Sequence, residues 1–138
     1  MAEIGQYVDI LLESLRKKKS ILQRLLEENG KQEEAIKENS DTTVFDRIVQ
    51  TKGCFIAELE LLDSGFEKIY DRIRDGLSEE KAVFRNEIAQ MKQLISEITD
   101  LSVSVQTSER RNKQLIDNYF SYARGKIRQA KKSVRAAN

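Results

Sequence analysis

Apolar residues recur at intervals of three and four positions along most of this chain, a spacing that places them on one face of an α-helix. The first such segment covers residues 3–37. Its repeated apolar positions are Ile4, Val8, Leu11, Leu15, Leu22 and Leu25. Lys18 and Asn29 interrupt this face. The pattern predicts a long first helix that packs one side against other parts of the chain.

A polar segment, residues 38–43, is rich in residues that cap helix N-termini, so we expect one helix to end here and another to begin. The second helix should cover residues 42–75, with apolar residues at alternating a and d positions of a heptad repeat. These positions are Phe45, Ile48, Phe55, Leu59, Leu62, Phe66, Ile69 and Ile73. Lys52 breaks the series. Gly53 and Gly65 lie inside this helix, where we expect close approach of a neighbouring helix or a bend.

A third apolar pattern runs from residue 79 to about residue 132 without a proline. Gly76 should end the second helix, and Ser78 should act as the N-cap of the third. The pattern predicts one very long helix. Residues 100–108 are dense in Ser and β-branched residues, which form helices poorly, so a kink or break is expected there. The final residues, 133–138, should form a flexible basic tail.

These lengths and short connections predict an all-α fold in which residues 1–138 form a single helical domain. The second and third helices should pair as an antiparallel hairpin, with the first helix packed against both. The result would be a three-helix bundle with coiled-coil-like packing. At about 1.5 Å per residue, the second helix should span roughly 50 Å and the third roughly 80 Å. The third helix should therefore extend beyond its partners from near Asn112.

The composition excludes most enzyme chemistry. The chain has 138 residues with no His, no Trp, no Pro and one Cys. Without His there is no imidazole base and no His metal ligand. Cys54 has no second Cys with which to form an internal disulfide or a metal site. Carboxylates at adjacent positions, such as Glu79 and Glu80, lie about 100° apart around a helix and cannot share a proton or metal. We expect no enzymatic activity, no metal and no cofactor.

The expected end of the third helix has more apolar surface than one packing seam requires. Two neighbouring stripes lie there, Leu115, Tyr119 and Tyr122 in one, and Ile116, Phe120, Ala123, Ile127, Ala130 and Val134 in the other. At about 100° per residue the stripes cover an arc of roughly 160°. Because aromatic residues often anchor protein interfaces, this face is a candidate binding site. Alternatively, it is core covered by a folded-back helix or by a second copy.

Charge is distributed unevenly along the chain. The formal net charge is +1, but residues 110–138 contain nine basic residues and one acid, Asp117. That segment has a net charge of +8, so residues 1–109 must have a net charge of −7. A basic helix of this kind can bind nucleic acid, a membrane surface or an acidic partner. No nucleic-acid-binding motif is present, which argues against the first of these partners.

The first residues show no basic segment followed by an apolar core, so they do not resemble a secretory signal. No uninterrupted apolar run exceeds the four residues 54–57, far fewer than a membrane span needs. We therefore expect a soluble, cytoplasmic protein.

The chain resembles the FlgN family of flagellar type III export chaperones, which are small cytosolic helical proteins of about this length. The resemblance rests on three segments that together span most of the chain. They are residues 7–15 (YVDILLESL), residues 52–59 (KGCFIAEL) followed by Leu62, and residues 109–116 (ERRNKQLI) running on to Tyr119 and Phe120.

The resemblance implies a chaperone that binds the C-terminal helical segments of hook-filament junction (hook-associated) proteins and keeps them soluble for type III secretion. Components of the export apparatus are further partners that it implies, and no cofactor is required. The residues expected to contact the client are Leu115, Ile116, Tyr119, Phe120, Tyr122 and Ile127, with Arg124 and Lys126 as charges at the rim.

Three other readings of the sequence remain open. The first is a FliT-like chaperone of the filament cap protein. The second is a structural coiled-coil protein that forms a homodimer through its third helix. The third is a basic-tailed helical protein that binds nucleic acid.

Overall fold

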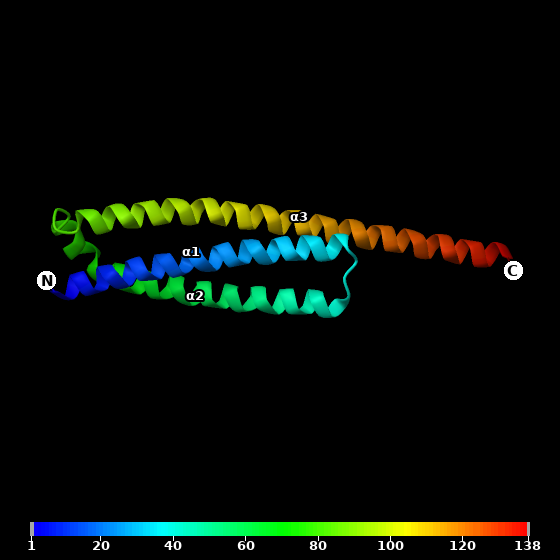
Figure 1. Ribbon diagram of the computed structural model, residues 1–138, viewed down its shortest axis with the longest axis horizontal. Coiled ribbons are helices and arrows are strands. Elements are labelled where there is room, and N and C mark those ends of the chain that lie inside the picture. The colour runs from blue at the N-terminus through cyan, green and yellow to red at the C-terminus, as the bar shows by residue number, and fades with distance from the viewer. Residues whose placement is uncertain (1, 138) are drawn as a thin grey trace.

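The computed structural model describes residues 2–137, which form three α-helices and no strand. In chain order the helices are α1 (Ala2–Lys37), α2 (Thr42–Glu79) and α3 (Arg85–Ala137). They lie lengthwise beside one another, with α1 and α3 running in one direction and α2 in the other (Figure 1). The fold is an all-α, up-down-up bundle, as the apolar periodicity predicts.

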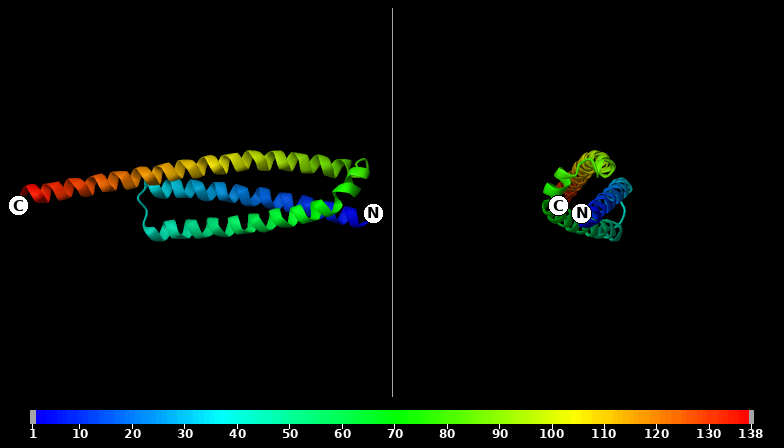
Figure 2. Two further views of the ribbon diagram at one scale, coloured as in Figure 1. Left: turned by 180° about the vertical axis from the view of Figure 1, so that it is seen from behind. Right: turned by 90° about the vertical axis from the view of Figure 1, so that its left-hand side faces the viewer.

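The helix α1 lies between α2 and α3 and packs against both (Figure 1, Figure 2). No Cα atom of α2 comes within 8 Å of a Cα atom of α3 in the described residues. The expected side-by-side pairing of the second and third helices is therefore wrong. Adjacent residues such as Leu11 and Leu12 are both buried on α1, as are Ile21 and Leu22. Because adjacent positions point about 100° apart, α1 has two apolar faces, one for each neighbour.

The core follows these two faces of α1. Val8 and Leu11 are fully buried, at 0% exposure, and most of the other buried core residues also come from α1. The rest of the buried cluster is Leu12, Leu15, Leu22 and Leu25 from α1, Ile73 and Leu77 from α2, and Met91 and Ile98 from α3. The apolar a and d residues of α2 that pack against this cluster are only partly buried, because α3 does not cover them.

The connection between α2 and α3 differs from the expected one. The helix α2 continues to Glu79, and the backbone N–H of Glu80 donates to the carbonyl of Gly76 at 3.1 Å, so Gly76 does not end the helix. The helix α3 begins only at Arg85, not after Ser78. The reason is Leu77, which is buried in the core and would leave it if the helix stopped earlier.

Close approach of α1 and α2 occurs at Gly76 rather than at the glycines where it was expected. A Cβ atom added at Gly76 would lie 2.7 Å from Cδ1 of Ile4, so a larger residue would force Ile4 to move. A Cβ atom at Gly53 or Gly65 would meet no atom within 4 Å. The expected close approach at Gly53 and Gly65 is therefore wrong.

The long helix α3 shows no break in residues 100–108, where a kink was expected. The hydroxyls of Thr99 and Thr107 donate to the backbone carbonyl four residues earlier, at 2.8 and 2.9 Å. These polar side chains are thus satisfied within the helix and do not compete with its backbone hydrogen bonds. Leu101 and Val105 pack against the core, which holds this segment on α1.

The helix α3 extends beyond the ends of α1 and α2 (Figure 1). Asn112, where the extension was expected to begin, is buried at 2% exposure. The side chains of residues 121–136 are exposed apart from a half-buried Ala123, so the free part of α3 begins at Ser121 and the helix continues to Ala137. At about 1.5 Å per residue this free part spans about 25 Å. The expected flexible tail, residues 133–138, instead continues α3 as far as Ala137, and residue 138 lies outside the described residues.

Candidate functional site

Four buried polar side chains form a layer across the three helices, just before α3 leaves the bundle. Asn29 and Gln32 come from α1, Lys52 comes from α2 and Asn112 comes from α3. Each is less than 9% exposed. Asn29 and Lys52 are two of the residues that interrupt the apolar patterns of their helices, so these interruptions meet at one level of the bundle.

Hydrogen bonds join this polar layer across all three helices. The Asn112 amide Nδ2 donates to the backbone carbonyl of Asn29 at 2.9 Å and to Gln32 Oε1 at 3.3 Å. The Lys52 ammonium donates to Gln32 Oε1 at 3.1 Å and forms an ion pair with Glu109 at 2.5 Å. Because sliding one helix by a turn would break these bonds, the layer fixes the register of the helices. It thereby fixes which residues of α3 pass the end of the bundle.

The connection between α1 and α2 is shaped by local backbone chemistry. Asn39 adopts a φ of 53°, in the left-handed region that Asn tolerates better than most residues and that commonly ends a helix. Asp41 is the N-cap of α2, and its carboxylate accepts a hydrogen bond from the backbone N–H of Val44 at 3.2 Å. This short turn reverses the chain direction and places the start of α2 beside the end of α1 (Figure 1).

A largely apolar pocket of about 420 Å³ lies beside the polar layer, where α3 passes the α1–α2 connection. One wall consists of Ile116, Tyr119 and Phe120 of α3. The remaining lining residues are Gln32 and Ile36 of α1, Asn39 and Ser40 of the connection, and Thr42, Phe45, Asp46 and Val49 of α2. We call this feature the end pocket.

The aromatic side chains of α3 at the end pocket are half exposed and contact each other. Tyr119 is 48% exposed and Phe120 is 53% exposed. Their ring centroids are 5.8 Å apart, and the rings meet edge to face at 67°. This geometry is favourable for an aromatic pair, and both rings line the end pocket.

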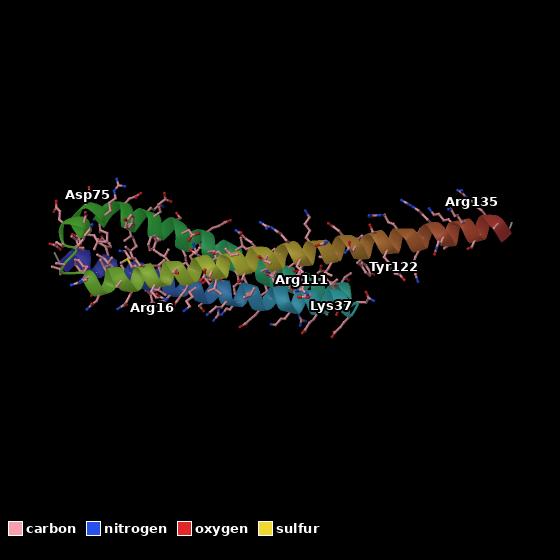
Figure 3. All side chains as sticks on the ribbon, turned by 90° about the horizontal axis from the view of Figure 1, so that it is seen from above. Arg16, Lys37, Asp75, Arg111, Tyr122 and Arg135 are labelled. Atoms are coloured by element: carbon pink, nitrogen blue, oxygen red, sulfur yellow. The ribbon has the colours of Figure 1, made fainter. Side chains whose placement is uncertain are left out.

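Apolar side chains continue along α3 beyond the end pocket. Tyr122, Ile127 and Val134 are 64%, 55% and 61% exposed. Lys126 places its ammonium 5.2 Å from the centroid of the Tyr122 ring, a cation–π contact. We call this stretch together with Ile116, Tyr119 and Phe120 the apolar face of α3. In the view from above, Tyr122 and Arg135 lie beyond the end of α1 (Figure 3).

The structure brings some of the residues proposed from the sequence together and leaves others apart. Ile116, Tyr119 and Phe120 share the end pocket, whereas Leu115 is half-buried and does not line it. Tyr122, Arg124, Lys126 and Ile127 lie farther out on α3, and Arg124 Nη2 donates to the Ser121 hydroxyl at 3.4 Å.

Sequence reasoning missed the walls that α1 and α2 add to the end pocket, among them Ile36 and Val49. Val49 is 57% exposed and lies outside the heptad positions of α2. Ile56, seven residues later on the same side of α2, is also exposed, at 47%. The sequence does contain a signal for this wall, because these two apolar residues share a face of α2 outside its packing seam.

A second groove, of about 480 Å³, lies between α2 and α3 with α1 as its floor. Its sides include the exposed residues Ile95 and Val103 of α3. Lys18 of α1 forms an ion pair with Asp63 of α2 in this groove, at 2.7 Å. Lys18, which interrupts the apolar pattern of α1, therefore links α1 to α2.

Glu33 of α1 binds cations from two helices close to the end pocket. Its carboxylate lies 2.9 Å from the Lys37 ammonium and 2.7 Å from the Arg111 guanidinium of α3. Arg111 and Lys37 occupy the same level of the bundle in the view from above (Figure 3). The hydrogen bond from Lys37, with a smaller contribution from the charge of Arg111, lowers the pKa of the Glu33 carboxyl below its usual 4.5.

This lowered pKa predicts a pH effect. The Glu33 ion pairs should be formed above pH 4.5, and should be lost as the pH falls through the lowered pKa of this carboxyl. In Lys37→Met the Glu33 pKa should rise toward 4.5, because the main hydrogen bond is removed. An NMR titration of side-chain carboxyl carbons measures this change.

Glu97 is the internal control for that titration. Its pKa is also lowered, by hydrogen bonds from Lys19 and Gln93 on a distant part of the bundle. The Glu97 midpoint should be the same in the parent chain and in Lys37→Met. Equal shifts of Glu33 and Glu97 would contradict the assignment, because they would indicate a global change.

In the part of the chain that the structure describes, no three His, Cys, Asp or Glu side chains are grouped so that they could hold a metal ion. None of the described helices has an apolar stretch long enough to cross a membrane.

The fold and the apolar face together define a class, an elongated all-α bundle whose longest helix leaves apolar side chains uncovered. A comparison with protein-family models matches residues 1–134 to the FlgN protein family. The chain belongs to the FlgN family, which is a family of flagellar export chaperones and not of enzymes. No curated protein and no solved structure matches the chain.

Proposed function

We propose that this protein is a cytosolic chaperone that binds the C-terminal helical segments of hook-filament junction proteins and keeps them soluble for type III secretion. The observation that supports this function best is the end pocket together with the exposed apolar face of α3. Membership of the FlgN family supports the chaperone role.

The apolar face has the geometry that an amphipathic client helix needs. Ile116, Phe120, Ile127 and Val134 are separated by four, seven and seven positions, so they form one line along α3. A client helix lying along this line would bury its own apolar side chains against them, as in other helix-in-groove recognition. Both surfaces are prone to aggregate when exposed, so covering them keeps the client soluble.

The end pocket includes the first two residues of this line, Ile116 and Phe120. Here α1 and α2 also contribute walls beside the apolar face, through residues such as Ile36 and Phe45. A large client side chain inserted there would be enclosed by three helices. Enclosed anchors of this kind usually account for most of the binding free energy of an interface.

Titration calorimetry of the full chain tests this function. The ligands are peptides with the C-terminal helical segments of hook-associated proteins, the corresponding segment of the filament cap protein, and duplex DNA. We expect Kd values of about 1 μM or lower for the hook-associated segments, with weaker binding of the cap segment and no binding of DNA at moderate salt. Preference for the cap segment would support the FliT-like alternative, and DNA binding alone would contradict the proposal.

Sedimentation velocity tests the remaining alternative, a coiled-coil homodimer. The proposed function predicts a monomer at micromolar concentration, with the apolar face free for clients. A concentration-dependent dimer that hook-associated segments cannot dissociate would show instead that a second copy covers α3.

A further inference from the structure

Five of the basic side chains in residues 110–138 lie in one stripe along α3. Lys113, Arg124, Arg128, Lys131 and Arg135 are separated by 11, 4, 3 and 4 positions, which are the spacings of one helix face. At about 100° per residue, and measured from Phe120, these five residues lie between about 20° and about 80°. We call them the basic edge.

The basic edge runs directly beside the apolar face, on one side of it. By the same construction Ile116, Ile127 and Val134 lie between about −40° and about −20° from Phe120, so the apolar line and the basic edge are neighbours. The opposite side of the apolar face differs. There, Lys126 contacts the Tyr122 ring. Farther around the helix lie the uncharged residues Asn118, Gly125 and Gln129, together with Lys132 and with Arg111, which is paired with Glu33.

The five side chains of the basic edge are exposed, and none of them forms an ion pair with another described residue. The one acid of this segment, Asp117, lies on the same side of the helix, at about 60°, and leaves the edge strongly positive. Basic residues also stabilise helix C-termini, but that effect extends only over the last turn. Lys113 and Arg124 lie well before the last turn of α3, so the helix dipole does not account for them.

We infer that the segment bound on the apolar face is an acidic amphipathic helix whose carboxylates lie along one edge, facing the basic edge of α3. This inference rests on the proposed function, because it names the chemistry of the client. A helix with an apolar line and one acidic edge would cover the apolar face and neutralise the neighbouring cations together. Because the five residues of the basic edge lie on one side of the apolar line and only Lys126 borders the other side, the charges also favour one orientation of the client helix.

The experiment uses two designed helical peptides with the same apolar line. One peptide has Glu along one edge, and the other has Gln at the same positions. The full chain is compared with the triple variant Arg124→Glu, Arg128→Glu and Lys131→Glu. We expect the variant to bind the Glu peptide at least about tenfold more weakly, and the Gln peptide within about threefold of the parent chain. Higher salt should reduce binding of the Glu peptide only.

Two controls separate charge recognition from damage to the fold. A matched variant reverses three exposed basic residues on the body of the bundle, Lys17→Glu, Arg24→Glu and Lys68→Glu, and should bind both peptides as the parent chain does. A third peptide with Lys along its edge should bind the α3 triple variant at least about tenfold better than it binds the parent chain. An unfolded variant could not show this gain.

Equal binding of the Glu and Gln peptides, or equal loss in both triple variants, would overturn the inference. The proposed function would still stand in that case if hook-associated segments bind the parent chain. Failure of those segments to bind would instead contradict the proposed function, whatever the designed peptides do. Salt-sensitive binding of duplex DNA that the α3 variant abolishes, without binding of the Glu peptide, would assign the basic edge to nucleic acid and overturn the inference.

Discussion

Replacing Tyr119 and Phe120 together by Ala should weaken binding of the hook-associated C-terminal segments at least about 100-fold, because aromatic anchors in enclosed pockets often contribute about 2 kcal/mol or more each. Both rings line the end pocket, and both are about half exposed, at 48% and 53%. They are therefore available to a client while adding little to the core. Titration calorimetry with the same peptides measures the loss.

The matched control is Tyr70→Ala on α2. Tyr70 is 42% exposed, similar to Tyr119, but it stacks on Phe66 and does not line the end pocket. The Tyr70→Ala substitution should therefore leave client binding unchanged. Thermal unfolding followed by circular dichroism completes the test. If the double variant no longer unfolds cooperatively, the two rings belong to the core and the assignment of the binding site is wrong.

Asn112→Ala should destabilise the bundle by about 2–4 kcal/mol, because it removes two buried hydrogen bonds between α3 and α1 and opens a cavity. The Asn112 amide is the donor to both the Asn29 carbonyl and Gln32 Oε1, and Asn112 is only 2% exposed. Urea unfolding of the full chain measures the change in the free energy of unfolding.

Asn118→Ala is the control for that measurement. Asn118 lies six residues farther along the same helix and is exposed, so its substitution should change the free energy of unfolding by less than about 0.5 kcal/mol. Equal effects of Asn112→Ala and Asn118→Ala would show that the polar layer does not hold the helices in register.

The helical class and the boundaries of the first helix could be predicted because they depend on local chemistry. Heptad spacing in residues 45–73 predicts a helix whatever its neighbours are, and Asp41 caps α2 with its own side chain, which accepts from the nearby Val44 N–H. The lateral order of the helices could not be predicted in the same way. It depends on the second apolar face of α1, through Leu12 and Ile21, which a search for a single stripe overlooks.

The end of α2 was mispredicted because two signals competed at Gly76. A glycine followed by Ser78 is a common helix-ending sequence, but burial of Leu77 outweighs it and extends the helix to Glu79. Gly76 instead allows the Ile4 side chain of α1 to lie close to the backbone of α2. Contacts between residues 72 positions apart are not visible in a local pattern.

The candidate site was predicted in part. The apolar arc of α3 follows from helix periodicity alone, so Ile116, Tyr119 and Phe120 could be named from the sequence. The walls from α1 and α2 could not, because they depend on where α3 leaves the bundle. The polar layer sets that point, and the sequence shows its members, such as Asn29 and Lys52, only as isolated interruptions.

Hydrogen–deuterium exchange of the full chain, with and without a saturating hook-associated C-terminal segment, tests the central claim most directly. Binding on the apolar face predicts slower amide exchange in residues 113–136 of α3, which include the apolar face and most of the free part of the helix. It also predicts slower exchange around the α1–α2 connection that closes the end pocket. Slower exchange confined to residues 95–106, along the groove between α2 and α3, would contradict the claim and move the client site there.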